Sequence, residues 1–177
     1  MTSPPASVLF DKGVIRRIYE RRVRLALGEP PTLLQVEAAN AFARVAALTN
    51  RLYITEQTAN ILRRRTPVFA APLLADLTPL KKARYLRRWA RRLRDYGFSP
   101  EDAIVLAYGS FGVAVGATLQ TGVEMLVTAD LKLAARYHDA FADIEARFSE
   151  MVSSLPSEYA GLALPQILTT SDVMKLL

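Results

Sequence analysis

The sequence of 177 residues contains no cysteine and only one histidine, His138. Without cysteine the chain forms no disulfide bond, no thiolate-bound zinc or iron–sulfur centre, and offers no thiol nucleophile. A single histidine is too few for a metal site that needs several imidazole ligands. Any polar chemistry must therefore come from carboxylates, hydroxyl groups and arginine.

Long uncharged runs are scarce, and the one at residues 103–123 is long enough to span a bilayer. The run contains glycines and polar residues and has no flanking aromatic belt, so a buried central helix that leads into a turn explains it better. The N-terminal residues are polar and rich in proline, and they lack the charged and apolar regions of a secretory signal. We therefore expect a cytoplasmic protein that does not bind membranes.

Apolar residues make up 51% of the sequence and charged residues 23%, which is sufficient for a folded core. The net charge is +6, and the excess is concentrated in residues 81–94, where lysine and arginine occur without any acidic residue. A concentrated basic segment indicates a polyanionic partner more strongly than an evenly high isoelectric point does.

Short β-type runs alternate with helical stretches along the chain. We predict strands at residues 6–10, 51–54, 125–128 and 164–168. We predict helices at residues 13–27, 33–48, 56–65, 79–96, 100–115, 131–137, 139–152 and 171–176. This alternation predicts one domain over residues 1–177, a three-layer α/β/α sandwich with a central, mostly parallel sheet. Within it, residues 68–97 are expected to form a helical insertion or an elongated helical hairpin.

Three segments carry helix start signals. Thr32 and Gln35 have the spacing of a capping box. Ser99 precedes a proline and two acidic residues, an order that suits an N-cap and the positive end of the helix dipole. Thr78 and Pro79 predict the start of the basic helix in the same way.

Three aspartates have positions that suit a metal site. Asp11 and Asp130 each come just after a predicted strand, and Asp102 lies in the first turn of a predicted helix. Ligands of open parallel sheets bind beyond the carboxyl ends of the strands, and hard carboxylate oxygens there suit Mg²⁺ or Mn²⁺. Each acid also has an ordinary structural alternative: Asp11 and Asp130 as helix caps, and Asp102 as a residue that stabilises the helix dipole.

Four segments resemble the PIN-domain nuclease family, distantly including the VapC-type toxins of toxin–antitoxin pairs. They lie at residues 8–11 (VLFD), 53–56 (YITE), 99–107 (SPEDAIVLA) and 126–130 (LVTAD), within residues 7–167. The resemblance implies a metal-dependent ribonuclease that hydrolyses RNA phosphodiesters with carboxylate-bound Mg²⁺ or Mn²⁺. By motif match, the catalytic and metal-binding acids are Asp11, Asp102 and Asp130, and the hydroxyl of Thr128 supports them.

One position departs from the family pattern. The family usually carries a glutamate in the helix after the second strand, where this sequence has Asn60 or Ile61. Glu56 lies on the same helical face as Asn60, so either is a possible fourth participant, although Glu56 equally suits a residue that stabilises the helix dipole. Glu101 is a spare acid that supports the site. The missing glutamate leaves open a catalytically degenerate module that binds RNA or another protein.

The basic segment is predicted as an amphipathic helix. Its apolar stripe consists of Leu80, Ala83, Leu86, Ala90 and Leu93. Its basic side consists of Lys81, Arg84, Arg87, Arg88, Arg91 and Arg94. We expect the basic side to bind the phosphate backbone of single-stranded RNA, although a solvated surface face is the common alternative. A third hypothesis is that the apolar stripe docks onto an antitoxin-like protein or, in a homodimer, onto a second copy of the chain.

Overall fold

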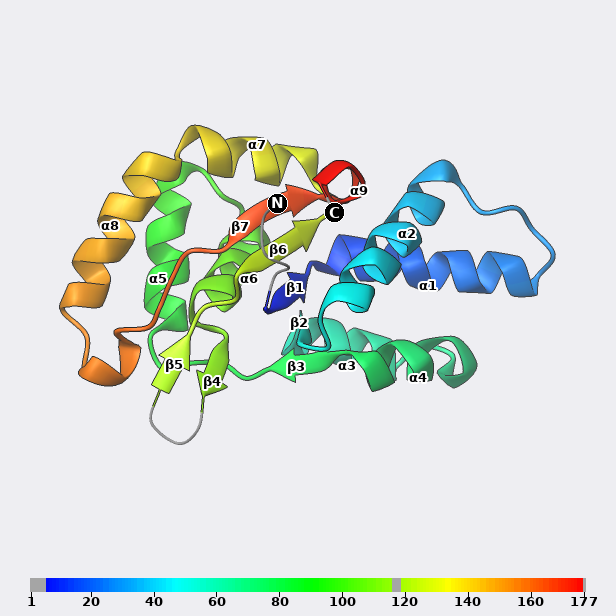
Figure 1. Cartoon of the computed structure of the whole chain (residues 1–177), viewed down its shortest axis with the longest axis horizontal. Helices are drawn as coiled ribbons and strands as arrows, with labels where there is room; N and C mark the ends of the chain where they lie inside the picture. Colours follow the sequence, from blue (N-terminus) through cyan, green and yellow to red (C-terminus); the bar gives the residue numbers. More distant parts are fainter. Residues whose placement is uncertain (1–5, 116–118, 177) are drawn as a thin grey trace.

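The computed structural model describes residues 6–115 and 119–176 (Figure 1). Residues 1–5 of the proline-rich N-terminal segment and residues 116–118 of the uncharged run lie outside these ranges. The strands are β1 (Val8–Phe10), β2 (Leu52–Thr55), β3 (Thr78–Leu80), β4 (Val113–Val115), β5 (Leu119–Thr121), β6 (Met125–Thr128) and β7 (Gln166–Thr169). The helices are α1 (Lys12–Ala26), α2 (Leu33–Leu48), α3 (Glu56–Arg63), α4 (Pro67–Asp76), α5 (Leu86–Leu93), α6 (Pro100–Phe111), α7 (Leu131–Asp139), α8 (Phe141–Ser153) and α9 (Thr170–Leu176), with short 3₁₀ turns η1 (Arg94–Tyr96) and η2 (Ser157–Tyr159).

Five strands form one parallel sheet in the order β3-β2-β1-β6-β7. The chain begins at the centre with β1, adds β2 and β3 on one side, and then returns to add β6 and β7 on the other side. The connections therefore leave β1 and β6 in opposite directions, which opens a crevice beyond the carboxyl ends of these two strands. The prediction of a central parallel sheet is confirmed.

Each face of the sheet has its own apolar core. Successive side chains of a strand point to opposite faces, so Val8 and Phe10 pack on one face and Leu9 on the other. The face of Val8 is covered by α1, α2, α3, α4 and α9, and the face of Leu9 by α5, α6, α7 and α8 (Figure 1). Helices thus flank both faces of the sheet, and burial of the strands on both sides explains their nearly continuous apolar sequences.

Two predicted helix starts are present with their hydrogen bonds. The hydroxyl of Thr32 accepts the amide N–H of Gln35, and the side chain of Gln35 accepts the amide N–H of Thr32, which forms the capping box of α2. The Ser99 hydroxyl accepts the amide N–H of Asp102 at 3.1 Å and caps α6. These contacts fix where both helices begin.

Residues 68–97 differ from the prediction because they contribute a strand to the sheet. Thr78–Leu80 form β3, which pairs in parallel with β2, and the basic helix α5 begins only at Leu86. A Thr-Pro pair suits an edge strand as well as a helix start, since a proline is tolerated where one side of the strand is unpaired. The prediction of a helix from Thr78 is therefore wrong, and this segment holds a strand between α4 and α5 in place of a helical hairpin.

The predicted central helix also ends earlier than expected. Helix α6 stops at Phe111, and β4 then pairs with β5 in a separate antiparallel sheet, so the expected extension to about residue 115 is wrong. At Gly112 an added Cβ would collide with the carbonyl oxygen of Tyr108, which explains why glycine stands at this exit. Within the described ranges, every helix is too short or too polar to cross a membrane.

Candidate functional site

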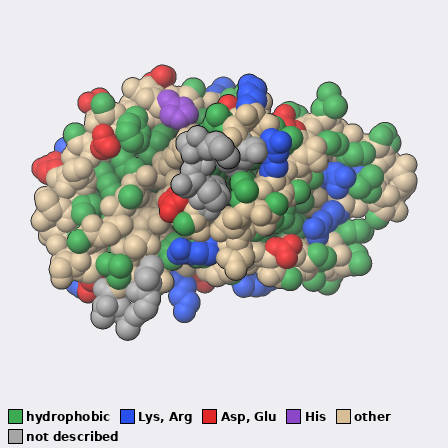
Figure 2. Space-filling model, in the orientation of Figure 1, with side chains coloured by type: hydrophobic (Ala, Val, Ile, Leu, Met, Phe, Trp, Pro, Cys, Tyr) green, Lys and Arg blue, Asp and Glu red, His purple; other side chains and the backbone are tan. Residues whose placement is uncertain are grey.

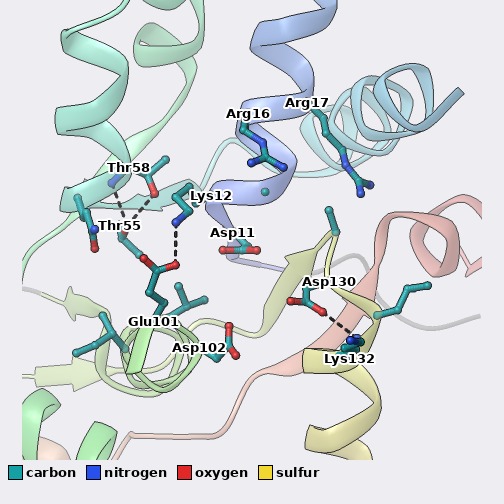
Figure 3. Close-up of a pocket in the computed structure, with 16 residues that line it drawn as sticks. Asp11, Lys12, Arg16, Arg17, Thr55, Thr58, Glu101, Asp102, Asp130 and Lys132 are labelled. Atoms are coloured by element: carbon teal, nitrogen blue, oxygen red, sulfur yellow. Dashed lines mark hydrogen bonds and ion pairs between the residues drawn. The ribbon is translucent and has the colours of Figure 1, made fainter. Parts of the chain in front are cut away.

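A cleft of about 370 Å³ lies beyond the carboxyl ends of β1 and β6 (Figure 3). Asp11 directly follows β1, Asp130 comes two residues after β6, and Asp102 reaches the cleft from the first turn of α6. Open parallel sheets bind their ligands where the strand order reverses, which is this position. The structure therefore brings the three predicted acids to one cleft.

Thr128 connects two of these acids. Its side chain is fully buried, and its hydroxyl donates a hydrogen bond of 3.1 Å to Oδ2 of Asp11. The same hydroxyl oxygen accepts the amide N–H of Asp130 at 3.0 Å. Because one hydroxyl contacts both residues, Thr128 fixes the Asp11 carboxylate relative to the end of β6. Thr128, which the motif match gave as a supporting residue, thus contacts two of the acids in the cleft.

Asp11 is in a destabilising electrostatic environment. Burial is the largest cause that raises the pKa of this carboxyl, and the negative charge of Asp102 raises it further. The hydrogen bond from Thr128 and the nearby amides of Lys12 and Gly13 oppose this rise. Asp11 stands at the N-cap of α1, yet its side chain accepts no capping hydrogen bond of normal geometry. The simple capping role is therefore weak at this position.

Asp130 does serve as a helix cap. Its Oδ1 accepts the amide N–H groups of Lys132 at 2.8 Å and of Leu133 at 3.1 Å at the start of α7. Oδ2 accepts no hydrogen bond within the described residues, and Asp130 is exposed on the wall of the cleft. The capping contacts hold the carboxylate in place and leave one oxygen for a ligand.

Asp102 and Glu101 enter the cleft from the same turn of α6 but differ in their contacts. Within the described residues, the carboxylate of Asp102 accepts no hydrogen bond, and Figure 3 shows it directed into the cleft beneath Asp11. Glu101 forms an ion pair of 2.9 Å with Nζ of Lys12, which joins the first turns of α6 and α1. Both side chains of this pair are substantially exposed, so it contributes little to stability.

Four basic side chains share the cleft with the acids: Lys12, Arg16, Arg17 and Lys132. None of the four was predicted from the sequence as a residue of this cleft. The available signal was their position: α1 starts directly after β1, so its first two turns border the crevice, and Lys132 lies in the first turn of the helix after β6. Basic groups at this place suit phosphate oxygens, which guanidinium groups bind in a fixed fork.

Neither Glu56 nor Asn60 lines this cleft. Both lie along a separate depression with Lys82 and Tyr108, and Oδ1 of Asn60 accepts a hydrogen bond of 2.7 Å from Arg63. Helix α3 instead presents Gln57 and Thr58 to the cleft. The fourth acid in the cleft is therefore Glu101 from α6, and α3 supplies neutral polar groups only.

The carboxylate oxygens of the cleft suit a hard divalent cation, but three of the described carboxylates cannot bind the same ion. Among the described residues, no three acidic or histidine side chains lie close enough together to hold one ion. Mg²⁺ commonly binds through one or two carboxylates, with water and substrate phosphate completing its coordination. Asp11 and Asp102 are the pair that could hold the ion: burial is the main cause of the raised pKa of Asp11, but the charge of Asp102 is near enough to add to it, and neither carboxylate caps a helix.

The basic segment is divided between two surfaces. Arg87, Arg91 and Arg94 line a groove beside the cleft. Lys81 lies before α5, beside β3 and the β4–β5 hairpin, and the Arg84 guanidinium lies 5.5 Å from the centre of the Tyr85 ring. Arg88 is exposed on α5 but does not line the groove. Because Lys81 and Arg84 come before α5, the six basic residues do not form one helical face, and three of them share the groove. That the six bind RNA stays a prediction.

The apolar side of α5 is already used inside the protein. Leu86, Trp89 and Leu93 are fully buried in the core on the Leu9 face of the sheet. These side chains therefore form no exposed docking stripe in the folded chain, and an antitoxin-like protein or a second copy as partner stays a prediction. Exposed apolar side chains occur instead where α1 ends and α2 begins, as at Leu27 and Leu33. Figure 2 shows apolar and charged side chains interspersed over the face that it draws.

Comparison of the chain with protein-family models, with curated proteins and with solved structures gives no significant match. Functional inference therefore rests on the cleft and its surroundings.

Proposed function

We propose that this protein is a PIN-like endoribonuclease that depends on Mg²⁺ or Mn²⁺ and hydrolyses single-stranded RNA in the cleft beyond β1 and β6. The observation that carries the proposal is the meeting of Asp11, Asp102 and Asp130 at the reversal of strand order. Thr128 links Asp11 to the Asp130 backbone there, and basic side chains surround the acids. Together these groups suit a phosphodiester and the cation that neutralises it.

Each residue has a defined role in this proposal. Asp11 and Asp102 would hold the ion, which supplies an activated water and neutralises charge on the phosphodiester. Thr128 orients the Asp11 carboxylate, and the amides of α7 orient Asp130. Oδ2 of Asp130, which accepts no hydrogen bond within the described residues, would orient a water for the attack. Arg16, Arg17 and Lys132 bind phosphate oxygens and hold the strand.

The test is cleavage of a labelled single-stranded RNA with Mg²⁺, with Mn²⁺ and with EDTA, using the wild type and Asp130→Asn. Asparagine keeps the oxygen that caps α7, so the fold is retained while the charge is removed. We expect metal-dependent cleavage by the wild type, and no cleavage but unchanged RNA binding by the variant. Equal cleavage by both proteins would reject the site assignment.

A second candidate function is a PIN-like module that binds RNA without cleaving it. Two observations favour it: within the described residues no three acids are spaced for one ion, and α3 contributes no acid to the cleft. This candidate predicts salt-sensitive RNA binding with no metal-dependent product in the same assay.

A further inference from the structure

A groove lies between α5 and α6, beside the cleft. It is lined by Arg87, Arg91 and Arg94 and by three apolar residues, Ala90, Pro100 and Ile104, which together are termed its apolar floor. The α5 residues follow the spacing of one helical face, so their side chains are presented together along the groove. The groove thus combines three guanidinium groups with an apolar floor.

The groove and the cleft are parts of one surface. Ile104 lines both of them, and α5 packs closely along α6, whose first turn supplies Asp102 to the cleft. A ligand that places a phosphate beside Asp102 can therefore extend over Ile104 into the groove.

The charge in the groove has no internal compensation. No acidic residue lines it, and among the described residues none of its three arginines forms a salt bridge. Arg87 and Arg91 are four residues apart on an exposed helix face, a spacing at which like charges destabilise the helix. An anionic ligand would remove this repulsion.

We propose that this groove binds one nucleotide of single-stranded RNA next to the nucleotide in the cleft, with the base against Ala90, Pro100 and Ile104 and the phosphate on the arginines. This inference rests on the proposed function because the cleft defines the neighbouring nucleotide. An apolar floor suits the face of a base, and guanidinium planes both stack on bases and pair with phosphate. Only an unpaired strand offers its base faces in this way, since a duplex keeps them stacked.

The test is fluorescence anisotropy of a labelled single-stranded RNA and of the corresponding RNA duplex, in EDTA so that no cleavage occurs. Arg91→Ala is compared with Arg51→Ala, which removes an exposed arginine directly before β2, at the amino ends of the strands and so at the end of the sheet opposite the cleft. We expect Arg91→Ala to weaken single-strand binding about tenfold, as the loss of a charge-assisted contact does. Arg51→Ala should bind like the wild type, and all three proteins should bind the duplex more weakly.

Two results would contradict the proposal that the groove binds a nucleotide. One is equal single-strand affinity of Arg91→Ala and Arg51→Ala; the other is duplex binding as tight as single-strand binding, which removes the role of the apolar floor. Either result leaves the proposed function intact if the wild type still cleaves RNA with metal. Conversely, a wild type that never cleaves, together with weakened binding by Arg91→Ala, supports the groove and rejects the nuclease. Because Arg91 is exposed, the variant should unfold at the wild-type temperature.

Discussion

The cleft and the adjoining groove carry charge in opposite ways. Acids and bases both line the cleft, where Glu101 pairs with Lys12 and the aspartates face Arg16, Arg17 and Lys132. The groove has arginines and no acid. A surface of mixed charge can place a cation beside a phosphate, whereas a surface of one sign only attracts a polyanion. In the proposed function, the cleft therefore carries the chemistry and the groove the affinity for RNA.

The most severe test of this division is Asp102→Asn. The Asp102 carboxylate accepts no hydrogen bond within the described residues, so its loss should leave the fold unchanged. We expect the cleavage rate to fall about 100-fold or more, because a lost metal ligand removes several kcal/mol of transition-state stabilisation. Asp95→Asn, in η1 away from the cleft, is the matched control. RNA affinity should stay unchanged in both variants.

The groove depends on α5 being held by its buried face. Leu93 is fully buried, and Leu93→Ala should destabilise the protein by about 3 kcal/mol, as large-to-small changes in a core do. Arg91→Ala, on the exposed face of the same helix, should change stability by less than about 0.5 kcal/mol. Urea unfolding measures both values. If the two variants were equally destabilised, α5 would not divide into a core face and a binding face.

Asp11 offers a test through stability and pH. Its raised pKa means that the folded state holds a proton that the unfolded state has lost, from about pH 3.8 up to the raised value. Stability therefore falls as pH rises through this window, and ionised Asp11 destabilises the protein at pH 7. We expect Asp11→Asn, which keeps an acceptor for Thr128, to raise Tm by a few degrees at pH 7 and by less near pH 4.

Divalent ions should reduce the difference in Tm between Asp11→Asn and the wild type. Added Mn²⁺ should raise the Tm of the wild type, because it binds the folded state only, and should leave Asp11→Asn unaffected. Thermal unfolding with and without Mn²⁺ gives the comparison, and an equal rise in both proteins would place the ion elsewhere.

The smallest expected effect is on the salt dependence of binding. Each phosphate contact with single-stranded RNA contributes about 0.7 to the slope of log affinity against log salt concentration. Arg94→Ala should therefore lower the slope by about 0.7, whereas Asp102→Asn should not lower it. Anisotropy titrations at several salt concentrations measure the slopes, and equal slopes for Arg94→Ala and the wild type would remove Arg94 from the RNA path.

The sequence predicted those parts of the fold that local signals determine. The capping box at Thr32, the cap at Ser99 and the apolar run of β6 are each specified by neighbouring residues. The parallel sheet followed from the alternation of strands and helices. By contrast, Thr78-Pro79 is compatible with both a helix start and an edge strand, and only pairing with β2 decides between them.

The site was predictable only in part for the same reason. Asp11 and Asp130 could be placed in one cleft because both follow strands, and the ends of parallel strands meet. Which side of α3 faces the cleft depends on how that helix packs, so the sequence pointed to Glu56 and Asn60 while the structure presents Thr58. Arg16 and Arg17 became site residues only once the strand order located the cleft beside α1.

Single-turnover cleavage of a labelled single-stranded RNA with Mn²⁺ separates the roles of cleft and groove, with Asp102→Asn and Arg91→Ala compared at rising protein concentration. We expect Arg91→Ala to reach the wild-type rate once the RNA is saturated, because only affinity is lost. Asp102→Asn should bind at wild-type concentrations and remain at least about 100-fold slower at saturation. Cleavage by Asp102→Asn at the wild-type rate, or no cleavage by the wild type, would contradict the proposal that this cleft is a metal-dependent nuclease site.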